Sequence, residues 1–239
     1  MKVLVVMGSP RKGNTYRAAE RIRELMEARA PVEFEYLWLR DANLLPCRGC
    51  AVCVAKGEEH CPNRDDLQAI VQRMDEADGV VLASPVYSWA VSGQFKVFVD
   101  RLSYIMHRPR FHGKQALVLA TGMLDTKEVV GYLAKVAQFW GFEVAARAGL
   151  ITPPTVPARR QETNERILAR GADSFSRALL SGRTAPGPRE VVMFHGARAL
   201  IDEQRDETPV DYRYWKERGW LEPGARITST CRRTLSAQR

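Results

Sequence analysis

Runs of consecutive apolar residues alternate along most of the chain with segments that repeat apolar residues every three or four positions. The runs KVLVVM, GVVLAS and QALVLAT, at residues 2–7, 79–84 and 115–121, are apolar at almost every position. A strand of this composition is buried on both faces, as in a parallel sheet that helices cover on each side. Residues 32–39 and 142–150 are predicted to be flanking strands of the same sheet.

The segments between these runs have the periodicity of amphipathic helices. Their apolar residues fall on one helical face over residues 19–26, 67–74, 95–102, 129–140 and 168–179. Strands and helices therefore alternate in the order βαβαβαβαβα, which is typical of a doubly wound α/β fold. With five strands, the predicted fold is a flavodoxin-like parallel sheet of strand order 2-1-3-4-5.

The end of the chain departs from this pattern. The alternating domain is predicted to span residues 1–182, and GRTAPGPRE (182–190) is predicted to be a linker into a C-terminal extension, residues 183–239. Exposed aromatic residues in the extension would be an apolar liability on a monomer, so we expect it to pack on a partner subunit in a homodimer or homotetramer. Packing on its own domain is the alternative. The aromatic residues concerned are Tyr212, Tyr214, Trp215 and Trp220.

Composition narrows the class of protein. A chain of 239 residues suits one elaborated α/β domain. No apolar stretch is long enough to cross a bilayer, and the first apolar run is too short for the core of a signal peptide, so a cytoplasmic location with no membrane partner is expected. The net charge is +8, but the basic residues are scattered arginines without interleaved aromatics, so no nucleic-acid partner is expected.

The segment MGSPRKGNT (7–15), here called the phosphate loop, joins the first strand to the first helix. In a parallel sheet this turn lies at the carboxyl edge, where backbone N–H groups and the helix dipole favour an anion. The loop also offers short polar side chains and a charged fork, from Ser9, Asn14, Thr15 and Arg11. The alternative is an ordinary turn that Asn14 or Thr15 caps.

The identity of the anion follows from what the phosphate loop lacks. Asn14 stands where the lysine of a nucleoside-triphosphate P-loop belongs, and the dinucleotide fingerprint G-x-G-x-x-G is absent. These differences disfavour a nucleoside triphosphatase. A ligand with one terminal phosphate and no metal fits the loop better.

A second loop follows the third strand, in ASPVYSWAVSGQFKVFVDR (83–101). Strands one and three are neighbours in the predicted order, and a ligand is expected in the crevice between their loops. Pro85 stiffens the turn, and Tyr87 and Trp89 offer flat aromatic surface. Together the two loops indicate a site for flavin mononucleotide (FMN). The alternative is that Tyr87 and Trp89 pack against the edge of the sheet.

These pieces together resemble the NADPH-dependent FMN reductase family of flavodoxin-like proteins. The matching pieces are GSPRKGNT (8–15), SPVYSWAVSGQFKVFVDR (84–101) and ATGM (120–123), in this order. The resemblance implies that the FMN phosphate contacts Ser9, Arg11, Asn14 and Thr15, that the isoalloxazine lies beside Pro85, Val86, Tyr87 and Ser88, and that Thr121 and Gly122 line its third side. The segment DYRYWKERGW (211–220) is also similar to the tail of many such flavoproteins.

Four of the five cysteines, Cys47, Cys50, Cys53 and Cys61, lie in one loop after the second strand with the spacing C-x2-C-x2-C-x7-C. In a reducing compartment this arrangement favours metal or redox chemistry over disulfides. The first three match the run that wraps a 4Fe-4S cluster in bacterial ferredoxins, whereas zinc sites more often use two separated pairs. Zinc, or cysteines without metal, remain alternatives. The fifth cysteine, Cys231, is predicted to be a single free thiol.

Within the family, this cysteine run resembles that of the iron–sulfur flavoproteins, which implies a cluster bound by Cys47, Cys50, Cys53 and Cys61. The second strand is the other neighbour of the first, so the cysteine loop (residues 47–61) is expected on the same edge as the flavin site. A cluster there could exchange single electrons with the flavin.

The sequence therefore predicts an FMN-dependent oxidoreductase. NAD(P)H is the expected reductant, and a small molecule or a protein is the expected acceptor. The flavin carries the hydride chemistry, so no side chain is expected to be catalytic. Three alternatives remain open: an electron carrier with the same cofactors, a cluster-free NAD(P)H:flavin or quinone reductase, and a redox sensor that uses the cysteine loop.

Other polar residues are expected to have structural roles. Asp65 and Asp66 are predicted to cap the second helix, and Asp100 and Arg101 to be a structural ion pair. The histidines are predicted to lie on the surface, without a catalytic partner; they are His107, His112 and His195.

Overall fold

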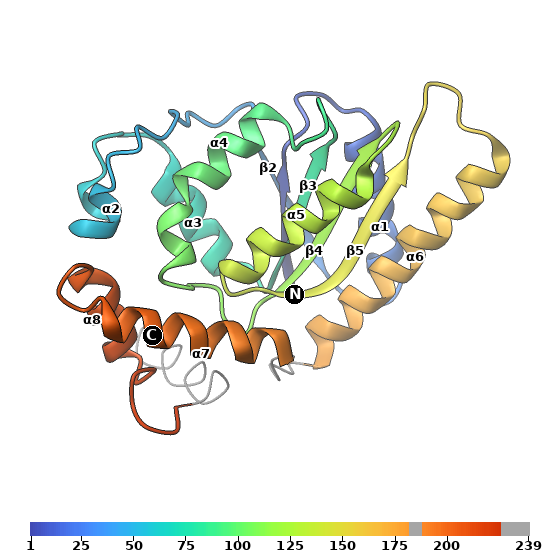
Figure 1. The fold of residues 1–239 in the computed structure, drawn as a ribbon. Helices are drawn as coiled ribbons and strands as arrows, with labels where there is room; N and C mark the ends of the chain where they lie inside the picture. The colour runs from blue at the N-terminus through green and yellow to red at the C-terminus, as the bar shows by residue number, and fades with distance from the viewer. Residues whose placement is uncertain (182–187, 226–239) are drawn as a thin grey trace.

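The computed structural model of the protein describes residues 1–181 and 188–225, and the side chains of 188–190 are not part of this description. Five strands form one parallel sheet in the order β2-β1-β3-β4-β5, which confirms the predicted topology (Figure 1). The strands are β1 (Lys2–Met7), β2 (Glu33–Trp38), β3 (Gly79–Pro85), β4 (Gln115–Gly122) and β5 (Glu143–Ile151).

Helices cover both faces of this sheet, as the unbroken apolar runs predicted. Helices α3 (Leu67–Glu76), α4 (Gly93–Arg101) and α5 (Thr126–Phe139) pack on one face, while α1 (Asn14–Glu27) and α6 (Ala158–Ser181) pack on the other. Successive side chains of a strand point to opposite faces. In β1, accordingly, Leu4 and Val6 enter the first layer of the core, and Val3, Val5 and Met7 enter the second.

The segment between β2 and α3 contains little regular structure. It carries the four cysteines and includes only α2 (Val52–Ala55) and the 3-10 helix η1 (Glu58–His60). A second 3-10 helix, η2 (Ser103–Met106), follows α4 and leads to β4. A four-residue helix has no stability of its own, so contacts from elsewhere must hold this segment in place.

The C-terminal extension contains α7 (Pro188–Glu203) and α8 (Pro209–Glu217), and it packs on the domain of its own chain. Figure 1 shows α7 across the bottom of the view and α8 below α2, which it contacts. The indole N–H of Trp215 donates to the carbonyl of His107 at 2.8 Å, and the Tyr214 hydroxyl donates to the carbonyl of Pro109 at 2.6 Å.

The extension buries the aromatic residues that were expected to be exposed on a monomer. Trp215 and Trp220 are 1% and 3% exposed, in a cluster with Phe194 and Ile201. That expectation is wrong, because α7 and α8 build a small core against residues 107–112 of the same chain. The subunit number and the domain boundary stay predictions. Most of the predicted linker, and Cys231, lie outside the described residues.

Over the described ranges, no helix combines the length and the apolar character that a membrane span requires.

His112 corrects another expectation, because it is buried rather than on the surface. Its ring packs edge-on against Trp220 of the extension, with 4.8 Å between the ring centroids. Burial, and to a lesser extent the charge of Arg218, lower the pKa of His112 from an ordinary value of 6.5 to about 4. The neutral imidazole is therefore the form that joins the extension to the domain.

We expect the burial of His112 to make the protein less stable in acid. The folded-state pKa lies below the unfolded one, so the unfolded chain binds the extra proton and stability falls as the pH drops from 6.5 towards 4. The contribution is about 1.4 kcal/mol per pH unit. Urea unfolding at several pH values measures how steeply the free energy of unfolding depends on pH. This dependence should be shallower in His112→Gln than in wild type, whereas His60→Gln, at an exposed histidine, should keep the wild-type dependence. Parallel slopes for all three proteins would contradict the assignment.

Candidate functional site

Two of the loops singled out in the sequence meet at the carboxyl edge of the sheet, at the top of Figure 1. Gly8, in the phosphate loop, is the point of contact. Its N–H donates to the carbonyl of Ala83 at 2.7 Å, and its own carbonyl accepts from the Ser92 hydroxyl at 2.6 Å and from the side-chain amide of Gln94 at 2.7 Å. The phosphate loop is thus fastened to β3 near its end and to the start of α4.

The phosphate loop leads into a helix whose first turn has no side-chain cap. The N-cap residue of α1 is Gly13, which has no side chain to offer, so the alternative that Asn14 or Thr15 caps the turn is wrong. The backbone N–H groups of that turn and the helix dipole attract an anion. Arg11, which is exposed, adds a charged fork beside them.

Two of the predicted phosphate ligands, Ser9 and Asn14, form hydrogen bonds within the chain. The Ser9 hydroxyl is buried and donates to the Arg11 carbonyl at 2.7 Å, which closes the loop. The Asn14 amide donates to the carbonyl of Thr152 at 3.4 Å, and its oxygen accepts from Arg17. Both side chains shape the loop, and they lie in it as the sequence predicted.

The predicted residues at the end of β4 meet the other two loops. The hydroxyls of Thr15 and Thr121 are buried and lie 2.7 Å apart. The N–H of Val86 donates to the Thr121 carbonyl at 2.8 Å, and a β-carbon on Gly122 would come within 2.8 Å of Val86. Thr15, Thr121, Val86 and Gly122, predicted from three separate segments, therefore form one cluster of contacting residues.

The β3–α4 loop contains a strained turn. Tyr87 and Ala90 exchange two backbone hydrogen bonds, and between them Ser88 and Trp89 have φ angles of 47° and 68°. Two consecutive left-handed residues define a tight turn that normally uses Gly or Asn. Such strain is tolerated where the surroundings hold it, often at a ligand site.

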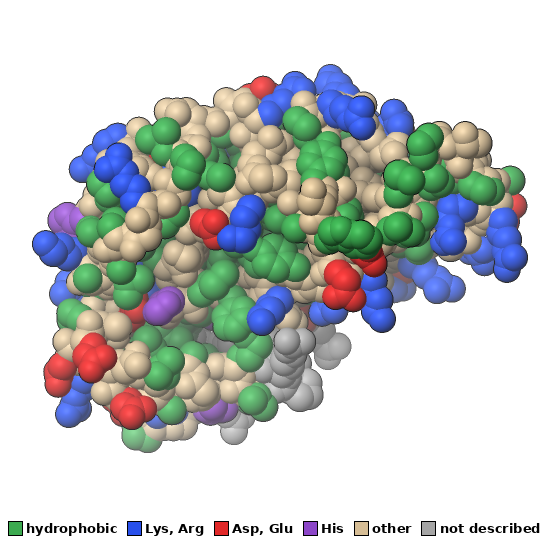
Figure 2. All heavy atoms as spheres, turned by 45° about the horizontal axis from the view of Figure 1, so that its top comes forward, with side chains coloured by type: hydrophobic (Ala, Val, Ile, Leu, Met, Phe, Trp, Pro, Cys, Tyr) green, Lys and Arg blue, Asp and Glu red, His purple; other side chains and the backbone are tan. Residues whose placement is uncertain are grey.

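The turn holds aromatic surface in the open. Trp89 is 71% exposed and Tyr87 is 42% exposed, so the alternative that they pack against the sheet edge is wrong. Met123 and Leu124, after β4, are also exposed. Figure 2, with the loops turned towards the viewer, shows hydrophobic side chains on this face and Lys and Arg side chains along its upper rim. A flat apolar ring with an anionic tail matches this surface.

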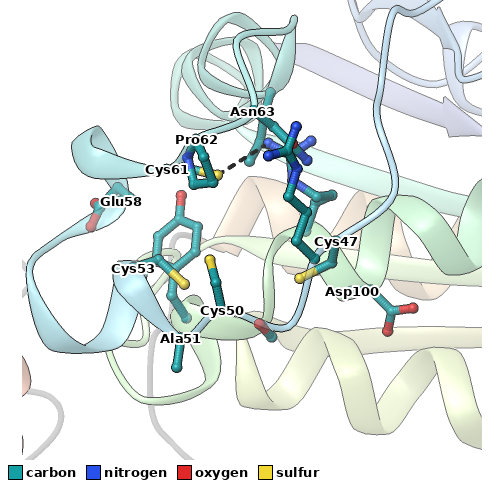
Figure 3. A pocket seen from close by; sticks show the side chains of 14 residues that line it. Cys47, Cys50, Ala51, Cys53, Glu58, Cys61, Pro62, Asn63 and Asp100 are labelled. Carbon is teal, nitrogen blue, oxygen red and sulfur yellow. Dashed lines mark hydrogen bonds between the residues drawn. The ribbon is translucent and has the colours of Figure 1, made fainter.

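The four cysteines line a second pocket, between the cysteine loop and the α4–η2 segment (Figure 3). Cys47 and Cys50 are exposed, while Cys53 and Cys61 are partly buried, and burial raises the pKa of Cys53. In the described ranges, no three His, Cys, Asp or Glu side chains converge on a position for a single metal ion.

Hydrogen-bond donors lie beside two of the four sulfurs. The N–H of Gly49 lies 3.4 Å from the Cys47 sulfur, and Arg101 donates to the Cys61 sulfur at 3.7 Å, as the dashed line in Figure 3 shows.

Arg101 and Asp65 form a buried ion pair that the sequence did not predict. Arg101 pairs with Asp65 rather than with Asp100, which binds Lys96 at 2.5 Å. Arg101 also donates to the carbonyl of Leu45 at 2.9 Å. The sequence did hold a signal for the burial of Arg101, because this residue lies three positions after Phe98, on the apolar face of α4.

The two aspartates before α3 hold the chain that precedes the cysteines. Asp65 accepts from the N–H of Leu45 at 2.9 Å, and Asp66 accepts from the N–H of Asn43 at 2.8 Å. Burial raises the pKa of Asp65, but hydrogen bonds from Arg101 and the backbone outweigh it, so the pKa lies below its ordinary value. Asp66 occupies the N-cap position of α3, but its side chain accepts no capping hydrogen bond from the helix. Asp65 accepts from the N–H of Leu67 at 3.3 Å, so the predicted capping is correct only in part.

Comparison with known proteins supplies an independent line of evidence. Residues 1–152 match the family model described as NADPH-dependent FMN reductase. An iron-sulfur flavoprotein of Archaeoglobus fulgidus is 31% identical over 227 residues, which cover 92% of this chain and 100% of the relative. Iron-sulfur flavoprotein MJ1083 of Methanocaldococcus jannaschii is 44% identical over 104 residues, 42% of this chain and 51% of that protein, so the match spans about half of its length.

Solved structures share the fold at lower identity. RosB with bound 8-demethyl-8-formylriboflavin-5'-phosphate has a TM-score of 0.64 and 16% identity, with coverage of 85% of this chain and 87% of that chain. An apo NADH:FMN oxidoreductase (EMOB) has a TM-score of 0.53 and 21% identity, with coverage of 79% and 92%. At these identities the structures establish likeness of fold.

We expect a methyl group at Gly8 to disturb the contact between the two loops. A β-carbon there would lie 2.6 Å from the Phe95 ring and 3.1 Å from the Ala83 carbonyl, so Gly8→Ala should destabilise the protein by about 1–3 kcal/mol. Gly93→Ala is the matched control, because a β-carbon at Gly93 meets nothing within 4 Å and should change stability by less than about 1 kcal/mol. Urea unfolding followed by circular dichroism measures both, and equal effects would refute the packing argument.

Proposed function

We propose, from its membership of the NADPH-dependent FMN reductase family and of the iron–sulfur flavoprotein subgroup, that this FMN-dependent oxidoreductase is an electron-transfer enzyme. Electrons would pass from NAD(P)H through FMN and a 4Fe-4S cluster to an acceptor. The acceptor is a small molecule or a protein. The residues that hold the two cofactors, proposed below, follow from the contacts at the carboxyl edge of the sheet.

The observation that carries this proposal is the adjacency of the two cofactor loops. Met7 and Trp38, the last residues of β1 and β2, are register partners, and the N–H of Leu39 donates to the Met7 carbonyl at 3.1 Å. Arg40 then reaches from the segment before the cysteines to the Pro10 carbonyl in the phosphate loop, at 2.9 Å. A flavin loop and a cysteine loop joined in this way suit electron transfer between their cofactors.

The residues of the phosphate loop, of the β3–α4 loop and at the end of β4 fit FMN. The uncapped first turn of α1 and the Arg11 fork suit a single phosphate, and no acidic side chain is needed to hold a metal beside it. We propose Ser9, Arg11, Asn14 and Thr15 as the phosphate site. The ring would lie beside Pro85, Val86, Tyr87 and Ser88, with Thr121 and Gly122 on its third side. Bound FMN supplies hydride acceptance and single-electron release.

The chain's own residues would bind the flavin and leave its ring accessible to a nicotinamide. Gly122 and Val86 bring the ends of β3 and β4 into close contact, while the turn at Ser88 and Trp89 keeps apolar surface exposed beside them. This open surface supports the proposal that a nicotinamide approaches the flavin directly. No side chain is assigned an acid or base role.

The cysteine pocket fits a 4Fe-4S cluster by the chemistry of its donors. We propose Cys47, Cys50, Cys53 and Cys61 as the ligands. The guanidinium of Arg101 and the N–H of Gly49 would stabilise negative charge on the sulfurs. A cluster supplies one-electron transfer.

Three further points belong to the same proposal. Residues 1–182 would be the FMN-binding domain, and 183–239 the extension. The active form would be a homodimer or homotetramer. The location would be the cytoplasm, where cysteines such as these four stay reduced.

Arg11→Ala tests the phosphate site. Loss of a charge-assisted hydrogen bond should weaken FMN binding by about 1.5–3 kcal/mol, roughly a 10- to 150-fold rise in Kd. Arg29→Ala removes the same charge at the opposite end of α1, where Arg29 pairs with Asp173, and should leave the Kd unchanged. Fluorescence titration of the apoprotein with FMN gives both values. Equal affinity in wild type and Arg11→Ala would remove Arg11 from the site.

Cys50→Ser tests the cluster. Anaerobically purified wild type should contain iron and sulfide and show broad visible absorbance beneath the flavin bands. Cys50→Ser should lose the iron, the sulfide and this absorbance but keep FMN. NADPH or NADH should still bleach the flavin of the variant. Cys231→Ser, at the cysteine outside the cluster motif, should match wild type. Zinc without sulfide in wild-type protein would rule out the cluster, and no bleaching by either nucleotide would rule out NAD(P)H as the donor.

A further inference from the structure

Arg108 is a buried arginine that touches the cysteine loop and the C-terminal extension at the same time. It is 6% exposed and lies just after η2. Its guanidinium donates to the carbonyl of Cys53 at 2.5 Å and to the carboxylate of Glu58 at 2.8 Å. On its other side, its Nε lies 3.0 Å from a carboxylate oxygen of Asp211 in α8.

Asp211 supplies the countercharge for this arginine. It is fully buried, at 0% exposure, in the first turn of α8, where the helix dipole also favours a carboxylate. Its second oxygen lies 3.1 Å from Nδ1 of His107. The hydrogen bonds from Trp215 and Tyr214 to the carbonyls of residues 107 and 109 fix α8 against the segment that carries Arg108.

The cysteine loop depends on such contacts because it has almost no secondary structure. Cys53 belongs to the four-residue helix α2, and η1 follows it. Arg101 and Asp65 hold one side of the loop, at Leu45 and Cys61. Arg108 holds the loop at Cys53 and Glu58, because its rigid fork can bind two acceptors at once while Asp211 pairs with its Nε.

We propose that Arg108 and Asp211 are positioning residues for the cysteine pocket, through which the C-terminal extension sets the place of Cys53. The inference rests on the proposed function, in which this pocket holds the cluster. Groups that orient metal ligands without touching the metal typically change metal affinity 10- to 100-fold when they are removed. The extension is then a part of the cofactor site rather than an appendage of the domain.

Two measurements on full-length protein test this role. The first is the rate at which iodoacetamide alkylates Cys53 in the metal-free protein, read by mass spectrometry, with Cys61 as the internal reference on the Arg101 side. The second is the rate at which a chelator removes iron from the loaded protein. In Asp211→Asn, both rates should rise about 10-fold while alkylation of Cys61 changes little. Glu58→Gln, which removes the negative charge of one acceptor of the same fork, should give a smaller rise.

A matched control comes from the neighbouring arginine. Arg110 lies two residues beyond Arg108 and binds Asp75 of α3 at 2.6 Å. Asp75→Asn therefore removes another arginine–aspartate pair, a more exposed one, from the same segment without touching the cysteine loop. Its alkylation and iron-loss rates should equal those of wild type.

A double variant separates positioning from stability. Arg108→Met with Asp211→Leu removes both buried charges together, which is often neutral for folding, whereas removal of one partner leaves an uncompensated charge. Thermal stability should be higher in the double variant than in Asp211→Asn, yet alkylation of Cys53 and loss of iron should stay fast, because the Cys53 carbonyl and Glu58 now lack the Arg108 donor. If both rates return to wild-type values with stability, the role is structural and the proposal is overturned.

The same data distinguish failure of this inference from failure of the proposed function. Wild-type protein without iron and sulfide would overturn the cluster, while the alkylation rates in metal-free protein would still decide whether Asp211 positions Cys53. A loaded wild type whose iron and Cys53 are held equally well in Asp211→Asn would overturn the positioning role and leave the cluster standing.

Discussion

The place of β1 between β2 and β3 in a parallel sheet is the constraint on which the rest of the structure depends. With β2 on one side and β3 on the other, and all strands pointing the same way, three loops leave the sheet at one edge. The phosphate loop lies in the middle, the cysteine loop follows β2, and the turn with the exposed aromatics follows β3. The apolar residues at every position of β1 after Lys2 allow this, because the strand is buried between two layers of helices.

The two halves of this edge are held by different means. The flavin side relies on backbone and small polar contacts, such as those at Gly8 and between Thr15 and Thr121. The cysteine side relies on two buried arginines, Arg101 and Arg108, which bind backbone carbonyls of a segment with little secondary structure. Buried ion pairs are weak contributors to stability, but loss of one partner costs about 3–5 kcal/mol. They serve here to define one conformation of the loop.

The C-terminal extension connects these features. Trp215, Trp220 and the neutral His112 give it an apolar core against the domain, and Asp211 gives it a charged contact with Arg108. Its tryptophans are therefore buried within the chain, whereas Val192 and Leu200 of α7 stay exposed. A partner subunit, which remains a prediction, would have to use surface that stays exposed, and the exposed Tyr87, Trp89, Met123 and Leu124 belong to the face where the flavin is proposed to bind.

The sequence alone determined the fold and the location of the candidate site. Unbroken apolar runs and helical periodicity are local properties, so they predicted the five strands, their order and the loops at the carboxyl edge. Motifs within those loops, together with the four cysteines, pointed to the family and its subgroup, because glycine, proline and cysteine at fixed spacing constrain the local backbone directly.

Tertiary structure alone decided which distant polar side chains meet. The pairs Asp65–Arg101 and Arg108–Asp211 join residues 36 and 103 positions apart, and neither periodicity nor a motif encodes such a pairing. The same holds for the burial of His112 and of the tryptophans in the extension, which depends on where α7 and α8 dock. Local sequence specifies backbone conformation, whereas the partner of a charge or of an apolar face is set by the packing of whole elements.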